Sequence, residues 1–198
     1  MKLLEKINEL KNSEIGNRVS ERLAEFSSNR DRFSELCFCI LTANSTAERC
    51  IRVQEKVGKG FESLRFEKLV SELKKNGCRF HTKRAEYIIS ARENKENLYD
   101  FEDVFLFREW LVKNIKGIGM KESSHFLRNI GYFDVAIIDF HIIDILVRER
   151  VIGEVKKLDR KNYLKIEEVL REMSSELGMS LGELDLYLWF METGKVLK

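Results

Sequence analysis

Apolar residues recur at spacings of three and four along almost the entire chain, which is the periodicity of an α-helix. Helical faces of this kind cover residues 3–10, 15–26, 33–41, 66–73, 85–91 and 163–177. No segment shows a convincing alternation of apolar and polar residues, and we interpret the one strand-like run, 135–138, as a buried connector. The sequence therefore predicts an all-α fold made of many short helices.

Residues that favour helix ends mark where several of these helices should begin. Ser45 with Glu48, and Ser180 with Glu183, have the spacing of a capping box, in which two side chains satisfy free backbone N–H groups. Asp159 is placed to cap the helix that carries the apolar face over 163–177. We therefore predict helix starts close behind Ser45, Asp159 and Ser180.

The size and charge of the chain limit the classes of function that it can have. Its 198 residues can bury a core, as one domain or two small lobes. The net charge is only +2, so any nucleic-acid contact must come from a local patch of cations. The charged start MKLLEK does not resemble a signal peptide, and no apolar run approaches the ~20 residues of a membrane span. We therefore expect a cytoplasmic protein that does not interact with a membrane.

The four cysteines, Cys37, Cys39, Cys50 and Cys78, do not form a metal-binding pattern. None belongs to a Cys-x-x-Cys pair, and no histidine lies at ligand spacing. Reduced and mostly buried thiols fit this pattern best. We expect no metal site.

The segment 114–121, which reads NIKGIGMK, joins two helical runs. Gly117 and Gly119 flank a single isoleucine and predict a hairpin too tight for side chains with a Cβ atom. The helix that follows the hairpin should begin with free N–H groups at the positive end of its dipole. The sequence therefore predicts an anion site here that suits a phosphate.

Lys121 falls in the first turn of the helix after the hairpin. A cation is poorly placed against the dipole at this end. The dipole and partial burial would both favour the neutral amine, which can attack an electrophile. A surface lysine that touches a DNA phosphate is the alternative, and this stretch by itself favours that alternative.

Asp139 lies 18 positions after Lys121, at the end of the apolar run 135–138. We predict that it is the N-cap of a helix over residues 140–150. The pattern is fully explained if Asp139 is only a structural cap of that helix. The functional hypothesis is a carboxylate held in a cleft beside Lys121.

The segments KGIGMK at 116–121 and IIDFH at 137–141 resemble the helix-hairpin-helix DNA glycosylase superfamily. The tail, with LDLYLW at 184–189 and TGKVLK at 193–198, resembles its type-2 8-oxoguanine DNA glycosylase/AP lyases. The resemblance implies a two-lobed helical fold with a DNA-binding cleft between the lobes. Lobe 1 would cover about residues 30–130, and lobe 2 about 1–29 with 131–198. One departure is the sequence VAII before Asp139, where the family often has Gly and Pro.

The resemblance also implies a chemistry for the pair. Lys121 would attack C1′ of the damaged nucleoside, release the base and form a Schiff base, after which β-elimination cuts the strand. Asp139 would stabilise the positive charge that grows on the sugar, or help to deprotonate Lys121. The cysteine-bound iron–sulfur loop of the endonuclease III branch is missing, because no cysteine follows Asp139.

Further DNA contacts follow from the same resemblance, each with an ordinary structural alternative. His141 would lie near a phosphate, and Asn44 would fill the space left by the extruded base. Phe80 and Trp189 are candidates to sandwich that base, although most aromatic residues at helical spacing are core residues. Lys198, with its carboxylate, would distinguish 8-oxoguanine from guanine. The flanking cations Arg79, Lys83, Arg84, Lys113 and Lys116 could hold phosphates.

The leading hypothesis is therefore a monomeric, bifunctional enzyme that acts on double-stranded DNA containing 8-oxoguanine. It needs no cofactor, although hairpin carbonyls could hold a monovalent cation, and it associates with the nucleoid. A glycosylase for another damaged or mismatched base is one alternative. A non-catalytic DNA-binding module that uses only the hairpin is another.

Overall fold

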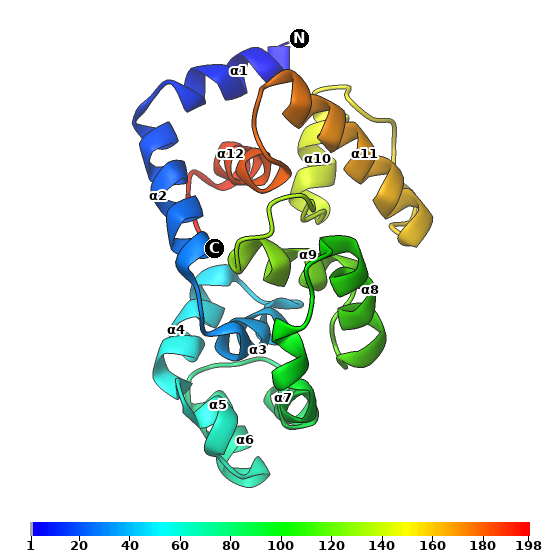
Figure 1. The fold of residues 1–198 in the computed structure, drawn as a ribbon. Coiled ribbons are helices and arrows are strands. Elements are labelled where there is room, and N and C mark those ends of the chain that lie inside the picture. Colours follow the sequence, from blue (N-terminus) through cyan, green and yellow to red (C-terminus); the bar gives the residue numbers. More distant parts are fainter. Residues whose placement is uncertain (1) are drawn as a thin grey trace. The chain divides into compact units, whose positions relative to one another are not determined.

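The structure is a computed structural model that describes residues 2–198, and every regular element within that range is helical (Figure 1). The all-α prediction is therefore confirmed. The elements are α1 (Lys2–Lys11), α2 (Glu14–Ser28), α3 (Arg32–Thr42), α4 (Ala47–Val57), α5 (Gly60–Ser63), α6 (Phe66–Lys75), α7 (His81–Ala91), η1 (Arg92–Asn94), η2 (Glu96–Tyr99), α8 (Val104–Asn114), α9 (Met120–Asn129), α10 (Phe140–Arg148), α11 (Arg160–Glu176) and α12 (Leu181–Thr193). Within residues 2–198, no helix combines the length and apolar character needed to cross a membrane. The expectation for the N-terminal hexapeptide includes Met1, which lies outside the described residues.

The chain divides into two compact units. The first unit combines the chain up to Ser28 with Leu127–Lys198, and the second unit comprises Asn29–Phe126. One boundary lies in the short link between α2 and α3. The other falls inside α9, between Phe126 and Leu127.

The second unit is built around α3. Its residues from Leu36 to Leu41 are almost completely buried, so this helix is apolar on all sides and must be covered on all sides. Helices α4 and α7 pack directly against α3, and α6 packs against α7. The free thiols of Cys37 and Cys39 are part of this core, and Cys50 and Cys78 are buried too, as predicted.

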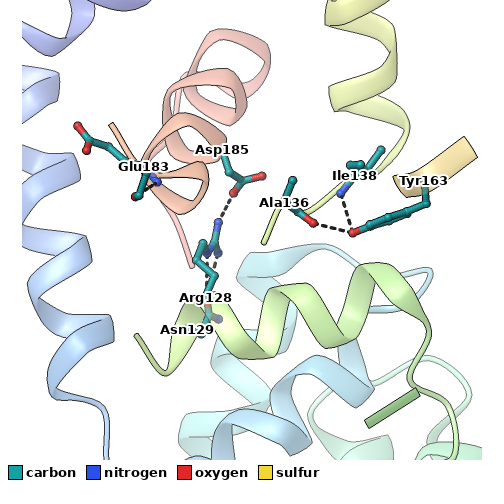
Figure 2. A network of polar contacts seen from close by, with 8 residues as sticks. Arg128, Asn129, Ala136, Ile138, Tyr163, Glu183 and Asp185 are labelled. Atoms are coloured by element: carbon teal, nitrogen blue, oxygen red, sulfur yellow. Dashed lines mark hydrogen bonds and ion pairs between the residues drawn. The ribbon is translucent and has the colours of Figure 1, made fainter. Parts of the chain in front are cut away.

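The first unit has the same design around α12. Residues 184–188 of this helix are all buried, and α1, α2, α10 and α11 surround it (Figure 1). One polar pair lies inside this core, because Arg128 of α9 forms an ion pair with Asp185 of α12. Arg128 also donates hydrogen bonds to the Asn129 side-chain oxygen, and Asp185 and Asn129 are buried with it (Figure 2).

Of the four predicted N-caps, Asp139, Asp159 and Ser180 are correct and Ser45 is not. Asp159 accepts a hydrogen bond from the Asn162 N–H at 3.0 Å, and Ser180 accepts one from the Glu183 N–H at 3.2 Å. The capping box predicted at Ser45 is wrong: α4 begins one residue later, with Thr46 at the N-cap and no side-chain cap bond. The connector 135–138 is buried and is not a strand, as predicted.

Candidate functional site

A five-residue turn, 115–119, joins α8 to α9 in the second unit. Gly117 has a φ of +84°, which L side chains rarely adopt. A Cβ atom added at Gly117 would lie 2.3 Å from Cδ2 of Tyr87, inside the ring's van der Waals surface. The prediction of a hairpin too tight for a side chain is therefore confirmed at this position.

Gly119 has a weaker steric requirement. Its φ is not in the left-handed region, and a Cβ atom there would approach only the flexible end of Glu122, at 3.2 Å from Oε2. The Gly119 N–H donates a hydrogen bond to that same Oε2 atom, at 3.2 Å. The expectation of a free donor is wrong for this N–H, since a phosphate would have to displace the Glu122 carboxylate.

Lys121 lies in the first turn of α9, as predicted, and is half-buried. Its positive charge acts on the thiol of Cys50 in α4, as do the charges of Arg84 and Arg49. Burial raises the pKa of Cys50, and these three cations oppose that rise. Lys121 and these two arginines therefore act on the same thiol, and Arg84 is itself buried with its guanidinium hydrogen-bonded to the Ala43 carbonyl.

Two loop tips of the second unit meet through one arginine. Asn44 and Phe80 both have left-handed backbones, with φ of 58° and 55°. Arg79 donates a hydrogen bond to the Asn44 carbonyl at 3.3 Å, and its guanidinium lies 5.5 Å from the centroid of the Phe80 ring. Such backbones cost on the order of 1–3 kcal/mol each and persist where the surroundings hold them. The structure thus brings together two of the predicted DNA contacts, and the Phe80 side chain is 55% exposed.

Asp139 is the N-cap of α10 in the first unit, as predicted. Its side chain accepts a hydrogen bond from the Ile142 N–H at 3.1 Å, and it remains half-buried. The helix ends at Arg148, two residues before the predicted end. The carboxylate lies at the positive end of the helix dipole, where a negative charge is favourably placed.

His141 and Trp189 also meet in the first unit. Their ring centroids are 5.2 Å apart with an interplanar angle of 89°, so one ring edge points at the other ring's face. His141 is exposed and Trp189 is half-buried. Since His141 follows Asp139 by two residues, this aromatic pair lies at the start of α10.

The chain's tail packs against the first unit instead of fraying. Val196 is only 6% exposed, and Leu197 and Lys198 are half-buried. This packing agrees with the expectation that the tail folds back on the protein. The role of Lys198 in base recognition stays a prediction.

Two features near Asp139 were not predicted from the sequence: an exposed phenylalanine, and two side chains of α11 that bind the backbone before Asp139. Phe140 is 80% exposed, although a phenylalanine is rarely left in water. The Tyr163 hydroxyl of α11 hydrogen-bonds to the backbone of Ala136 and Ile138 (Figure 2). Glu167 of the same helix accepts a hydrogen bond from the Ala136 N–H. One signal for the second feature was available, because Glu167 falls on the apolar face of its helix.

The predicted catalytic residues belong to different units. Lys121 lies in the second unit, with the hairpin, Asn44 and Phe80. Asp139 lies in the first unit, together with His141, Trp189 and Lys198. The prediction that Lys121 and Asp139 face one pocket stays a prediction.

Comparison with known proteins shows which family this chain is similar to. The family model described as 8-oxoguanine DNA glycosylase matches residues 17–179. The 8-oxoguanine DNA glycosylase/AP lyase of Methanocaldococcus jannaschii is 53% identical and is aligned over 100% of both chains. The one from Korarchaeum cryptofilum is 48% identical, with 99% of this chain and 98% of the relative covered.

Solved structures agree with the sequence comparison. The M. jannaschii glycosylase/lyase in complex with a 15mer DNA containing 8-oxoguanine matches with a TM-score of 0.96 at 52% identity, over 100% of both chains. The 8-oxoguanine DNA glycosylase of Thermotoga maritima matches with a TM-score of 0.91 at 42% identity, over 100% of this chain and 99% of the other. This chain therefore belongs to the 8-oxoguanine DNA glycosylase family.

Proposed function

We propose that this protein removes 8-oxoguanine from double-stranded DNA and then cuts the strand at the resulting abasic site. The observation that carries the proposal is a lysine in the first turn of α9, directly after the hairpin, in a chain whose full-length relative is a glycosylase/AP lyase. A lyase step of this kind requires an amine, because water cannot form an imine with the opened sugar.

Lys121 is the proposed nucleophile. Its neutral amine attacks C1′ of the damaged nucleoside, and the N-glycosidic bond breaks with its electron pair leaving on the base. The sugar ring then opens to give a Schiff base between Nζ and C1′. Loss of a C2′ proton expels the 3′ phosphate, which is the β-elimination that cuts the strand.

Asp139 is the proposed electrostatic partner. Its position at the α10 N-terminus and the hydrogen bond from the Ile142 N–H hold the carboxylate in a fixed place. A fixed negative charge stabilises the positive charge that develops on the sugar as the base leaves. Stabilisation of this charge suits Asp139 better than proton abstraction does.

The remaining site residues are proposed to hold DNA and the extruded base. Asn44 lies on an exposed loop tip, which suits insertion into the space that the extruded base leaves, and the exposed ring of Phe80 beside it is proposed to stack on that base together with Trp189. Trp189 and His141 offer a flat surface and a phosphate contact beside Asp139. Lys198 is proposed to help select 8-oxoguanine. The hairpin at Gly117 and Gly119 is proposed to approach the phosphate backbone.

The proposed reaction needs only protein groups. An amine nucleophile and a fixed carboxylate supply the chemistry, so we expect excision to persist in EDTA. The hairpin carbonyls are proposed to bind a monovalent cation, and substitution of potassium by a bulky organic cation would then weaken DNA binding. We further propose that the protein acts as a monomer on nucleoid DNA.

Borohydride trapping on a duplex that contains 8-oxoguanine tests the proposal directly. The native protein should form a covalent adduct, and Lys121→Gln should not. Lys68→Gln is the matched control, since Lys68 is an exposed lysine in α6 of the same unit. No adduct with the native protein, or undiminished trapping with Lys121→Gln, would refute the mechanism.

Duplexes that carry other bases test which base the protein removes and whether it is an enzyme or a DNA-binding module. Duplexes with guanine, an oxidised pyrimidine or mismatched thymine should be excised much more slowly than 8-oxoguanine. Faster excision of another base would assign a different substrate, and binding without any excision would indicate a DNA-binding module. Asp139→Asn should slow base release about 10²–10³-fold, the usual loss for a group that stabilises developing charge.

A further inference from the structure

The segment that leads to Asp139 is held by side chains from a helix that follows it in the chain. The Ala136 N–H donates a hydrogen bond to Oε1 of Glu167 at 2.9 Å. The hydroxyl of Tyr163 donates to the Ala136 carbonyl at 2.6 Å, and the Ile138 N–H donates to that hydroxyl at 3.3 Å. Figure 2 shows Tyr163 reaching from α11 to both backbone groups. Three backbone groups within three residues thus depend on two side chains of α11.

This segment cannot fix its own shape. Residues 134–139 read DVAIID, with neither glycine nor proline, so no residue restricts the backbone beyond the ordinary limits. The segment is not a strand, and Val135, Ala136 and Ile138 are nearly inaccessible to water. Buried N–H and C=O groups need partners, and each one left unpaired destabilises the folded state.

The two anchoring side chains are themselves firmly placed. Tyr163 is 2% exposed and Glu167 is 3% exposed, and they lie one turn apart on the 17-residue helix α11. The start of α11 is fixed by the Asp159 cap. The bond from Ile138 is one residue before Asp139, so a shift of this contact moves the Asp139 backbone directly.

We infer that Tyr163 is a positioning residue for Asp139, with Glu167 as a second anchor on the same segment. The inference rests on the role of Asp139 in the proposed function. Tyr163 contributes through its hydroxyl, which acts as donor to residue 136 and acceptor from residue 138. Removing that oxygen leaves a buried carbonyl and a buried N–H that regain partners only if the segment shifts. A catalytic group displaced by about 1 Å can lose about 10²-fold in rate.

Tyr163→Phe tests the inference, because it keeps the buried ring and removes only the hydroxyl. The expected result is an excision rate about 10-fold to 100-fold lower in single-turnover experiments. Affinity for the lesion duplex should stay within about twofold, since neither Tyr163 nor its segment's buried backbone reaches the surface.

Tyr187→Phe is the matched control. Tyr187 is a buried tyrosine of the same unit, 1% exposed; burial raises its pKa, and its hydroxyl is close enough to the Glu183 carboxylate of α12 for that carboxylate to raise the pKa of Tyr187 further. Both variants lose one buried hydroxyl, so both should be less stable than the native protein, and Tyr163→Phe more so because it leaves two buried backbone groups without a partner. Only Tyr163→Phe should slow excision when the two are compared at a temperature where each is fully folded.

The double variant with Asp139→Asn shows whether Tyr163 acts through Asp139. If it does, Tyr163→Phe slows the native enzyme but adds less than about twofold to the defect of Asp139→Asn. The inference is overturned if Tyr163→Phe stays within twofold of native, if Tyr187→Phe slows excision equally, or if the two defects multiply in full. If Asp139→Asn slows excision but Tyr163→Phe does not, the positioning role of Tyr163 is refuted and the proposed function stands. If Asp139→Asn excises at the native rate, the proposed role of Asp139 itself is refuted.

Discussion

Gly117→Ala should destabilise the hairpin for two separate reasons, the backbone conformation and a steric overlap. The backbone φ of +84° disfavours any residue with a Cβ atom. In addition, the new methyl group would lie 2.3 Å from Cδ2 and 2.6 Å from Cε2 of Tyr87. Real Cβ atoms do not approach other atoms so closely, so the ring or the turn must move.

Alanine substitutions at two other glycines separate the energetic cost of the backbone conformation from that of the steric overlap. The left-handed backbone costs about 1–2 kcal/mol with a Cβ atom, and forcing a methyl group into a packed site costs about 1–3 kcal/mol more. Gly77 has a φ of +77° with nothing within 4 Å of an added Cβ, so Gly77→Ala should show the backbone cost alone. Gly153 has neither problem, and Gly153→Ala should be nearly neutral.

Urea unfolding of the three alanine variants measures these two costs. We expect losses of about 2–5 kcal/mol for Gly117→Ala, about 1–2 kcal/mol for Gly77→Ala and less than about 0.5 kcal/mol for Gly153→Ala. Truncating the ring with Tyr87→Ala should remove the overlap, so the double variant should lose about 1–3 kcal/mol less than the sum of its parts. Equal losses for Gly117→Ala and Gly77→Ala, with no coupling to Tyr87, would refute the steric argument.

Further predictions concern buried polar groups. Asp185→Ala leaves the charge of Arg128 buried without its carboxylate and should cost about 3–5 kcal/mol in urea unfolding; a loss below about 1 kcal/mol would contradict this. Burial raises the pKa of Cys50, and that of Cys78 to about 11, so both thiols should react with a disulfide reagent at neutral pH only after unfolding. Fast labelling of the native protein would show that they are accessible. Burial and Glu183 raise the pKa of Tyr187 to about 12. The folded state holds this proton more tightly than the unfolded state does. The protonated tyrosine therefore stabilises the fold fully below about pH 10, and this stabilisation is lost as the pH rises through about 12. Tyr187→Phe should flatten the fall in stability over that window, and an unchanged slope would contradict the assignment.

Features that depend on neighbouring residues alone could be predicted from the amino-acid sequence. Asp139 and Asp159 were identified as N-caps from the residues that follow them, because a short carboxylate can reach an N–H only two or three residues ahead. The need for glycine at position 117 followed from the tight connection between two helical runs. Lys121 could be placed in the first turn of α9 for the same reason, since helix periodicity fixes its place once the turn is known.

Contacts between residues far apart in the chain could not be predicted and became visible only in the folded protein. The link between Asn44 and Phe80 depends on Arg79, which is 35 residues from Asn44, and no local pattern announces it. Glu122 takes the Gly119 N–H that looked free, because side-chain rotamers are settled by packing. Tyr163 and Glu167 hold a segment 25 to 31 residues away. Periodicity tells which face of a helix is buried, but the partner of a buried polar group is fixed only when the chain has folded and brought one within hydrogen-bond distance.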